Sequence, residues 1–128
     1  MIYRSNKYHS KKVTVDGIDF DSRKEARRFR ELALLEQAGQ ISDLQRQVKF
    51  VLIPAQREPN TVGKRGGIIK GKLLERECSY IADYTYTDSN GKFHVEDVKG
   101  YKGGGAYAVF AIKRKLMLHV HGIVIEEV

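Results

Sequence analysis

The sequence predicts an α/β domain in which a mixed central β-sheet is flanked by helices. Strand-like runs at residues 80–86 and 93–100 are joined by a Ser-Asn-Gly turn, which favours an antiparallel hairpin. Helical patterns at residues 22–38 and 106–120 precede and follow this hairpin. With 128 residues, 41% of them hydrophobic, we expect a single domain with a small core.

The N-terminal region begins with an arm and a short hairpin. Residues 1–12 are basic and polar, which predicts an arm that is either a solvated tail or a DNA contact. Residues 13–20 form two strand-like runs around an Asp16-Gly17 pair, and this pair is typical of a two-residue type I′ turn. We therefore expect a compact hairpin before the first helix.

The first helix, predicted over residues 22–38, carries an acidic residue on its apolar side. A rotation of about 100° per residue places Glu25 beside Phe29 and Leu32. Because burial of an unpaired charge is costly, this position needs an explanation. Glu25 can close a capping box with Ser22, or it can belong to a functional site, and the residues alone leave both open.

The central region contains one long strand and one irregular segment. Residues 41–53 predict a strand that ends at Pro54. Residues 55–72 are rich in Gly and Lys, which predicts a flexible basic loop. This loop lacks the spacing of a nucleotide-binding P-loop, so a nucleotide site is not expected there.

The C-terminal region is predicted to contain a glycine-rich link at residues 100–105, the second helix and a final strand at residues 123–125. The second helix is expected to pack its apolar residues inward, and these are Val109, Phe110, Ile112, Leu116 and Met117. The resulting order of strands and helices is typical of a sheet covered by helices.

The charge balance indicates a polyanionic partner. Lys and Arg exceed Asp and Glu by 23 to 16, which gives a net charge of +7. The side chains expected to contact nucleic-acid phosphates are Lys64, Arg65, Lys70, Lys72, Lys102 and Lys113. The single cysteine excludes an internal disulfide, and no apolar run is long enough to cross a membrane, so we expect a cytoplasmic protein.

Acidic and basic side chains gather around the predicted central hairpin. Side chains alternate along a strand, so Asp97 and Lys99 share one face while Glu96 lies on the other. Asp83 lies on the preceding strand. Carboxylates bind hard divalent cations, and a lysine ammonium can lie against the attacked phosphate or the attacking water. The pattern is typical of a metal-dependent phosphodiesterase, and alternation favours Asp97 over Glu96 as the second acid.

These residues resemble the motif of the PD-(D/E)XK nucleases, the superfamily of many restriction endonucleases and Holliday junction resolvases. Asp83 matches the first acid, Asp97 the second acid and Lys99 the lysine, while Ala82 stands where the family name has proline. The resemblance extends over nearly the whole chain and is greatest to a small branch found largely in phages and prophages.

The resemblance implies a restriction-endonuclease-like core and a Mg²⁺- or Mn²⁺-dependent DNA endonuclease. Branched, recombination or replication intermediates are the substrates that it suggests. It implies that Asp83, Asp97 and the backbone carbonyl of Val98 bind the metal, that Glu25 completes the site, and that Lys99 assists catalysis. It also implies action in a bacterial host and a homodimer, because many such nucleases cut two strands as dimers.

Two other classes of function remain open. One is a nucleic-acid-binding module of phage replication or recombination that has no catalytic activity. The other is a structural or partner-binding protein whose acidic residues only form salt bridges. Metal-dependent cleavage separates the first class from a nuclease, and the change in stability on removing an acid separates the second.

Overall fold

Two helices and a central sheet form the body of the protein. The computed structural model describes residues 12–128, so the predicted arm at residues 1–12 lies outside the described residues, apart from Lys12. In chain order the body contains β1 (Val13–Val15), β2 (Ile18–Phe20), α1 (Arg23–Gln37), β3 (Ile41–Ile53), β8 (Cys78–Asp88), β9 (Phe93–Asp97), α2 (Gly104–His121) and β10 (Glu126–Glu127).

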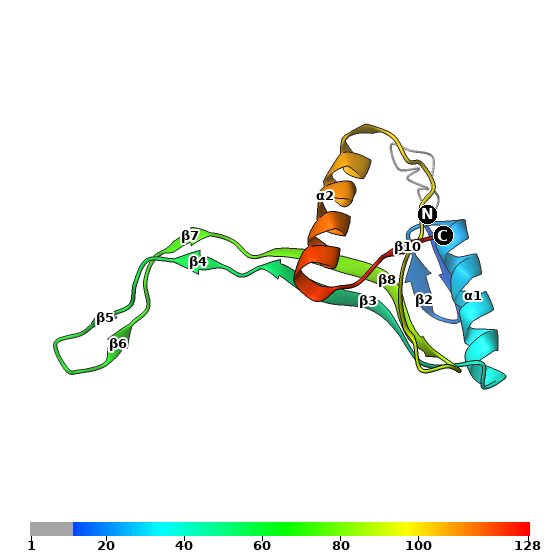
Figure 1. Cartoon of the computed structure of the whole chain (residues 1–128), viewed down its shortest axis with the longest axis horizontal. Coiled ribbons are helices and arrows are strands. Elements are labelled where there is room, and N and C mark those ends of the chain that lie inside the picture. Colours follow the sequence, from blue (N-terminus) through cyan, green and yellow to red (C-terminus); the bar gives the residue numbers. More distant parts are fainter. Residues whose placement is uncertain (1–11) are drawn as a thin grey trace.

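The central sheet is mixed and has the strand order β10-β9-β8-β3. β8 pairs antiparallel with both β3 and β9, whereas β9 and β10 are parallel. Figure 1 shows α1 and α2 beside this sheet. The predicted α/β class is therefore confirmed. The final strand was expected at residues 123–125 and instead pairs slightly later, as β10.

The N-terminal hairpin and α1 follow the local signals of the sequence. Asp16 and Gly17 have φ values of 52° and 77°, as a type I′ turn requires. Ser22 caps α1, because its Oγ accepts a hydrogen bond from Glu25 N at 3.1 Å. Gly39, with a φ of 76°, follows the end of the helix. The predicted hairpin and the predicted helix are both confirmed.

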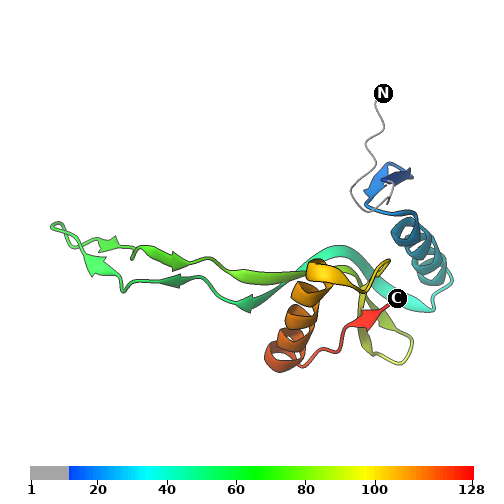
Figure 2. The same ribbon diagram turned by 90° about the horizontal axis from the view of Figure 1, so that it is seen from above.

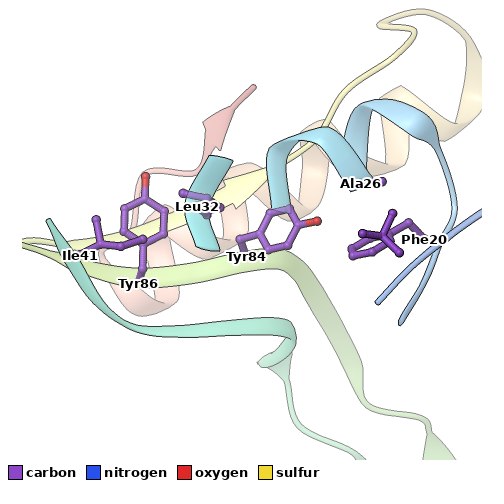
Figure 3. Packing of buried hydrophobic residues seen from close by; sticks show 7 residues of the cluster. Phe20, Ala26, Leu32, Ile41, Tyr84 and Tyr86 are labelled. Carbon is purple, nitrogen blue, oxygen red and sulfur yellow. The ribbon is translucent and has the colours of Figure 1, made fainter. Parts of the chain in front are cut away.

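Each helix covers its own hydrophobic cluster. The α1 cluster, shown in Figure 3, contains buried residues from the N-terminal hairpin, α1, β3 and β8, namely Val15, Phe20, Ala26, Leu32, Ile41, Tyr84 and Tyr86. The α2 cluster contains Leu52, Tyr80, Ala82, Val95, Phe110, Met117 and Ile125. Full burial of one such large side chain contributes about 1.5–3 kcal/mol to stability. β8 contributes to both clusters and therefore links the two helices.

Residues 54–77 form a long two-stranded ribbon. From here on, "the arm" means this ribbon and not the basic segment at residues 1–12. It contains β4 (Gln56–Arg57), β5 (Thr61–Val62), β6 (Ile68–Ile69) and β7 (Leu73–Glu75). β4 pairs with β7 and β5 with β6, both antiparallel. Figures 1 and 2 show that the arm continues β3 and β8 away from the body. The predicted loop at residues 55–72 is therefore wrong as secondary structure, because backbone pairing extends almost to the tip.

The second helix also departs from its prediction. α2 begins at Gly104, inside the expected link, and it ends one residue beyond the predicted range. Phe110 and Met117 are buried as expected, but Val109 and Ile112 are 55% and 60% exposed. The body is too small to cover the whole apolar side of this helix. Within residues 12–128, no helix is long and apolar enough to span a membrane.

Candidate active site

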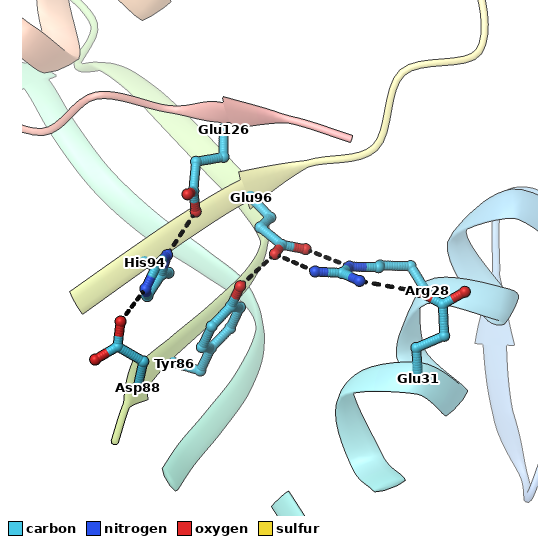
Figure 4. A network of polar contacts seen from close by, with 7 residues as sticks. All are labelled: Arg28, Glu31, Tyr86, Asp88, His94, Glu96 and Glu126. Carbon is cyan, nitrogen blue, oxygen red and sulfur yellow. Dashed lines mark hydrogen bonds and ion pairs between the residues drawn. The ribbon is translucent and has the colours of Figure 1, made fainter. Parts of the chain in front are cut away.

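Consecutive side chains of β9 point to different helices. Glu96 faces α1, where it accepts hydrogen bonds from Arg28 Nε at 2.7 Å, Arg28 Nη2 at 2.6 Å and Tyr86 Oη at 2.5 Å (Figure 4). Asp97 faces the α2 cluster, where Tyr80 Oη donates to its Oδ2 at 2.7 Å. The alternation that favoured Asp97 over Glu96 is therefore present in the structure.

Lys99 is held beside Asp97. Its Nζ lies 2.8 Å from Asp97 Oδ1 and 3.4 Å from the centroid of the Phe110 ring. The carboxylate and the aromatic face together fix the position of the ammonium group. The side chain of Lys99 keeps 18% of its surface exposed, so the ammonium group can still be approached.

Asp83, on β8, is joined to the segment that follows Asp97. Its Oδ2 accepts a hydrogen bond from Val98 N at 2.7 Å. Burial raises the pKa of Asp83 to about 6, and the negative charge of Asp97 acts in the same direction. The Val98 N–H and the Lys99 charge act against this rise without cancelling it. The two acids on neighbouring strands therefore repel each other.

The backbone around Val98 is held by hydrogen bonds to the C-terminal residue Val128. Lys99 N donates to Val128 O, and Val128 N donates to Asp97 O, both at 2.9 Å. In a trans peptide the carbonyl and the following N–H point in opposite directions. The Val98 carbonyl therefore points away from Val128.

Glu25 reaches the same region from α1, with only 6% of its surface exposed. Gln47 Nε2 lies 3.4 Å from Glu25 Oε1 and 3.4 Å from Asp83 Oδ1, so one amide bridges the two carboxylates. Burial raises the pKa of Glu25 to about 7, and the charges of Asp83 and Asp21 add to this rise. The backbone N–H of Glu25 donates to the helix cap at Ser22, while its side-chain carboxylate is directed toward Asp83 through Gln47.

Gln47 reaches both acids because β3 is distorted at this residue. Its φ of 53° is uncommon for a residue other than glycine. Pairing with β8 is regular on both sides, at Arg46–Tyr84 and Val48–Ala82. Such left-handed conformations cost about 1–3 kcal/mol and cluster at functional sites. Gln47 is exposed on β3, and its amide points to Glu25 and Asp83.

Three carboxylates and one ammonium group thus converge from α1, β8 and the end of β9. We call these four residues, Glu25, Asp83, Asp97 and Lys99, the acid cluster. The raised pKa values of Glu25 and Asp83 indicate that the negative charge is incompletely compensated. Carboxylate and carbonyl oxygens suit Mg²⁺ or Mn²⁺, and a divalent cation would supply the missing positive charge. Among residues 12–128, no three His, Cys, Asp or Glu side chains form a compact metal site.

A cavity of about 560 Å³ opens beside Glu25. Lys24, Val98 and the glycine-rich link before α2 contribute to its lining. A second cavity, of about 210 Å³, lies next to it and is lined by Lys24, Arg27 and Arg28. Basic side chains of α1 therefore line these two neighbouring cavities, where a phosphate could approach.

The basic residues predicted to contact phosphates lie in three places: on the arm, after β9 and on α2. Those on the arm are exposed and distant from the acid cluster along the ribbon; they are Lys64, Arg65, Lys70 and Lys72. Lys102 is exposed after β9, and Lys113 is half-buried on α2. The sequence analysis missed Tyr80 as a partner of Asp97 and Gln47 as a bridge. Both act through contacts between distant parts of the chain, which local patterns do not encode.

Comparison with known proteins gives a family without an assigned activity. No curated protein and no solved structure matches the chain. Residues 5–122 match the family described as protein of unknown function (DUF1064). The match includes both helices, the arm and all four residues of the acid cluster. The chain therefore belongs to the DUF1064 family.

Proposed function

We propose that the protein is a Mg²⁺- or Mn²⁺-dependent DNA endonuclease that hydrolyses phosphodiester bonds. The observation that carries this proposal is the convergence of Glu25, Asp83 and Asp97 with Lys99. Three carboxylates and one ammonium match the ligand and charge requirements of a phosphodiesterase metal site. The resemblance to PD-(D/E)XK nucleases, with their restriction-endonuclease-like core, supports the same assignment.

The site residues have separate roles in this proposal. Asp83, Asp97 and the Val98 carbonyl would hold the metal ion, with Glu25 as a further ligand. The metal would lower the pKa of a bound water and stabilise negative charge on the phosphate. Lys99 neutralises a non-bridging phosphate oxygen. Glu25, whose pKa is raised to about 7, can also accept a proton near neutral pH when it is not bound to metal.

Basic side chains, all exposed except the half-buried Lys113, support DNA as the substrate. Lys64, Arg65, Lys70, Lys72, Lys102 and Lys113 provide phosphate contacts on the arm, after β9 and on α2. The resemblance further supports branched DNA, a homodimer and action as a phage or prophage protein in the cytoplasm of a bacterial host.

One observation favours a second candidate, a DNA-binding module without catalysis. Both carboxylate oxygens of Asp97 already have partners, Tyr80 on Oδ2 and Lys99 on Oδ1. If these contacts persist, Asp97 has less capacity to bind a metal ion. The two candidates differ in a single measurable property, which is cleavage that depends on a divalent metal.

The deciding experiment incubates labelled linear, branched and single-stranded DNA with the protein in Mg²⁺, Mn²⁺ or EDTA. We expect cleavage of at least one DNA with metal and none with EDTA. Asp97→Asn should abolish cleavage, because it removes the charge of a ligand without changing the shape of the side chain. Asp43→Asn is the matched control, since Asp43 is exposed on β3 and bonds only Gln45 among the described side chains.

Metal binding separates the role of Lys99 from that of Asp97. Asp97→Asn should weaken Mn²⁺ binding and cleavage together. Lys99→Ala should keep or tighten Mn²⁺ binding, because a repelling cation is removed, yet lose most cleavage. If the wild-type protein binds DNA but neither binds Mn²⁺ nor cuts any DNA, the module without catalysis replaces the nuclease.

A further inference from the structure

The tip of the arm exposes apolar side chains. Val62, Ile68 and Ile69 are 74%, 78% and 55% exposed. Val62 and Ile68 are partners across β5 and β6, and side chains of directly paired residues lie on the same face of a ribbon. The tip therefore presents two neighbouring aliphatic side chains that no other part of the described chain covers.

The outer part of the arm is also strongly basic. Residues 59–74 include four basic residues and no acidic one; they are Lys64, Arg65, Lys70 and Lys72. All four are exposed. Positive charge around an apolar tip suits a polyanion that also offers apolar surface. Duplex DNA offers phosphates along its backbone and stacked bases in its grooves.

The shape of the arm is fixed by contacts of its own. At the tip, Gly63 N donates to Gly67 O at 2.7 Å. Midway along the arm, Gly71 N donates to Asn60 Oδ1 at 2.9 Å. A Cβ at Gly71 would lie 1.7 Å from Glu58 O, so the two strands approach closely enough there that only glycine fits. An isolated two-stranded ribbon is marginally stable in water, so a partner that covers the tip would stabilise it.

We infer that the arm enters a groove of duplex DNA and presses Val62 and Ile68 against a base step. A two-stranded ribbon fits the major groove, and apolar wedges inserted in the minor groove kink DNA. Duplex that is flexible or already bent at that step is then the preferred substrate. The choice of DNA rests on the proposed function, and the insertion itself does not require cleavage.

The arm also sets the distance between its apolar tip, Val62 and Ile68, and the acid cluster. At about 3.3 Å per residue, the tip lies up to about 55 Å from Gln47 along β3 and the arm. This distance corresponds to about 16 base pairs at about 3.4 Å each. The protein would therefore contact DNA more than one helical turn from the bond that it cuts.

A second copy of the chain is a less suitable partner for the tip. Two arms would bring together two strongly basic surfaces, and the whole chain already carries a net charge of +7. Val109 and Ile112, two further exposed apolar side chains, lie on α2 and are followed in sequence by three basic residues. Charge therefore opposes contact between the arms of two copies and favours nucleic acid as the partner of the tip.

The test measures binding and bending of a duplex of about 40 base pairs in EDTA, so that no cleavage occurs. Anisotropy gives affinity over a range of salt concentrations, and energy transfer between dyes at the DNA ends gives bending. The double variant Val62→Ser/Ile68→Ser should lose about tenfold in affinity and most of the bend, with its salt dependence unchanged. Lys64→Ala/Arg65→Ala should instead lower the salt slope by about 2.

Val109→Ser/Ile112→Ser is the matched control, because it removes two similarly exposed aliphatic side chains from another surface. It should bind and bend DNA like the wild type. The pair Val62→Thr/Ile68→Thr keeps the β-branched shape and serves if the serine pair disturbs the ribbon. Circular dichroism should give the wild-type melting temperature for all variants, since the tip residues lie outside both hydrophobic clusters.

Two results would overturn the inference. One is wild-type affinity and bending in both tip variants. The other is light scattering that shows a DNA-free dimer which the tip variants dissociate, because the tip would then be a protein interface. If the wild type cuts DNA and the tip variants bend it normally, only this inference fails. If the wild type bends DNA through its tip but never cuts it, only the proposed endonuclease fails.

Discussion

Two groups of carboxylates, Glu96 by itself and Glu25 together with Asp83, are neutralised to very different degrees. Toward α1, Glu96 is 1% exposed and receives two hydrogen bonds from Arg28 and one from Tyr86 (Figure 4). Glu25 and Asp83 instead share the Gln47 amide, at 3.4 Å from each, and Asp83 also accepts a hydrogen bond from Val98 N at 2.7 Å. The first group is a complete ion pair, whereas the second contains repelling charges.

This difference separates a structural role from a functional one. A fully paired buried charge joins α1 to β9 and leaves no unused ligand capacity. A cluster of carboxylates with raised pKa values reduces the stability of the protein when no ligand neutralises it, which is the behaviour expected of the proposed metal site. We therefore expect substitutions in the two groups to change stability in opposite directions.

The largest effect is expected at the paired group. Arg28→Ala should lower the free energy of unfolding by about 3–5 kcal/mol, because it leaves the Glu96 carboxylate buried and unpaired. Chemical denaturation measures this change. Glu31→Gln is the control, since Glu31 also bonds Arg28 but is half-exposed, and its change should stay within about 0.5 kcal/mol. Equal losses in both variants would contradict the structural role of Glu96.

The repelling group should respond in the opposite way. Asp83→Asn should raise the free energy of unfolding by about 1–2 kcal/mol at pH 7.5, because it removes a charge that burial and Asp97 disfavour. The asparagine carbonyl can still accept the hydrogen bond from Val98 N. Cleavage should be lost in the same variant. A less stable Asp83→Asn protein would indicate that this acid serves structure.

The pH dependence of stability should also reveal the repelling group. The pKa of Glu25 rises from 4.5 to about 7 and that of Asp83 from 3.8 to about 6, so the folded state binds more protons than the unfolded state between these values. Their contribution to stability is complete below about pH 4 and is lost as the pH rises toward 7. Thermal melts from pH 4 to 8 measure this loss.

The comparison variant for these melts is Glu25→Gln/Asp83→Asn, in which the decline with pH should be shallower. His94, whose pKa is raised by Asp88 and Glu126, declines in the same direction and remains in both proteins. The difference between the two curves therefore isolates the acid pair. If the melting temperatures of the two proteins change in parallel with pH, the pKa values of Glu25 and Asp83 are not raised.

The smallest effect is expected at the residue that bridges the acids. Gln47→Gly should raise stability by less than about 1 kcal/mol, because glycine adopts a φ of 53° without steric cost. It should also slow cleavage, since the amide that positions Glu25 and Asp83 is lost. Gln45→Gly, at a neighbouring exposed residue of β3, should instead reduce stability. An unchanged cleavage rate in Gln47→Gly would remove the bridge from the account.

Local sequence patterns predicted most helices and strands of the body, but they did not predict the strands of the arm. The Asp16-Gly17 turn, the cap at Ser22 and the alternation of Asp97 and Lys99 all depend on neighbours in sequence. The arm was missed because both of its faces are exposed, so no alternation of apolar and polar residues marks its strands. A Gly- and Lys-rich composition is shared by loops and by solvated ribbons.

Contacts between distant residues could not be predicted in the candidate site. The distortion at Gln47 is set by the pairing of β3 with β8, and Tyr80 meets Asp97 only after β8 and β9 fold together. Similarly, the periodicity of α2 marks an apolar side but not how much of it the small body covers. Sequence therefore singled out Glu25, Asp83 and Asp97 as candidates, and the fold was needed to show which contacts hold them.

The central claim is that Glu25 and Asp83 await a divalent cation. Calorimetric titration of Mn²⁺ at pH 6.5, in two buffers of different ionisation enthalpy, tests it directly because metal must displace protons from carboxylates with raised pKa values. We predict that the wild type binds Mn²⁺ and releases protons, and that Glu25→Gln/Asp83→Asn loses both properties. Wild-type protein that binds no Mn²⁺, or that binds it without releasing protons, would contradict the account.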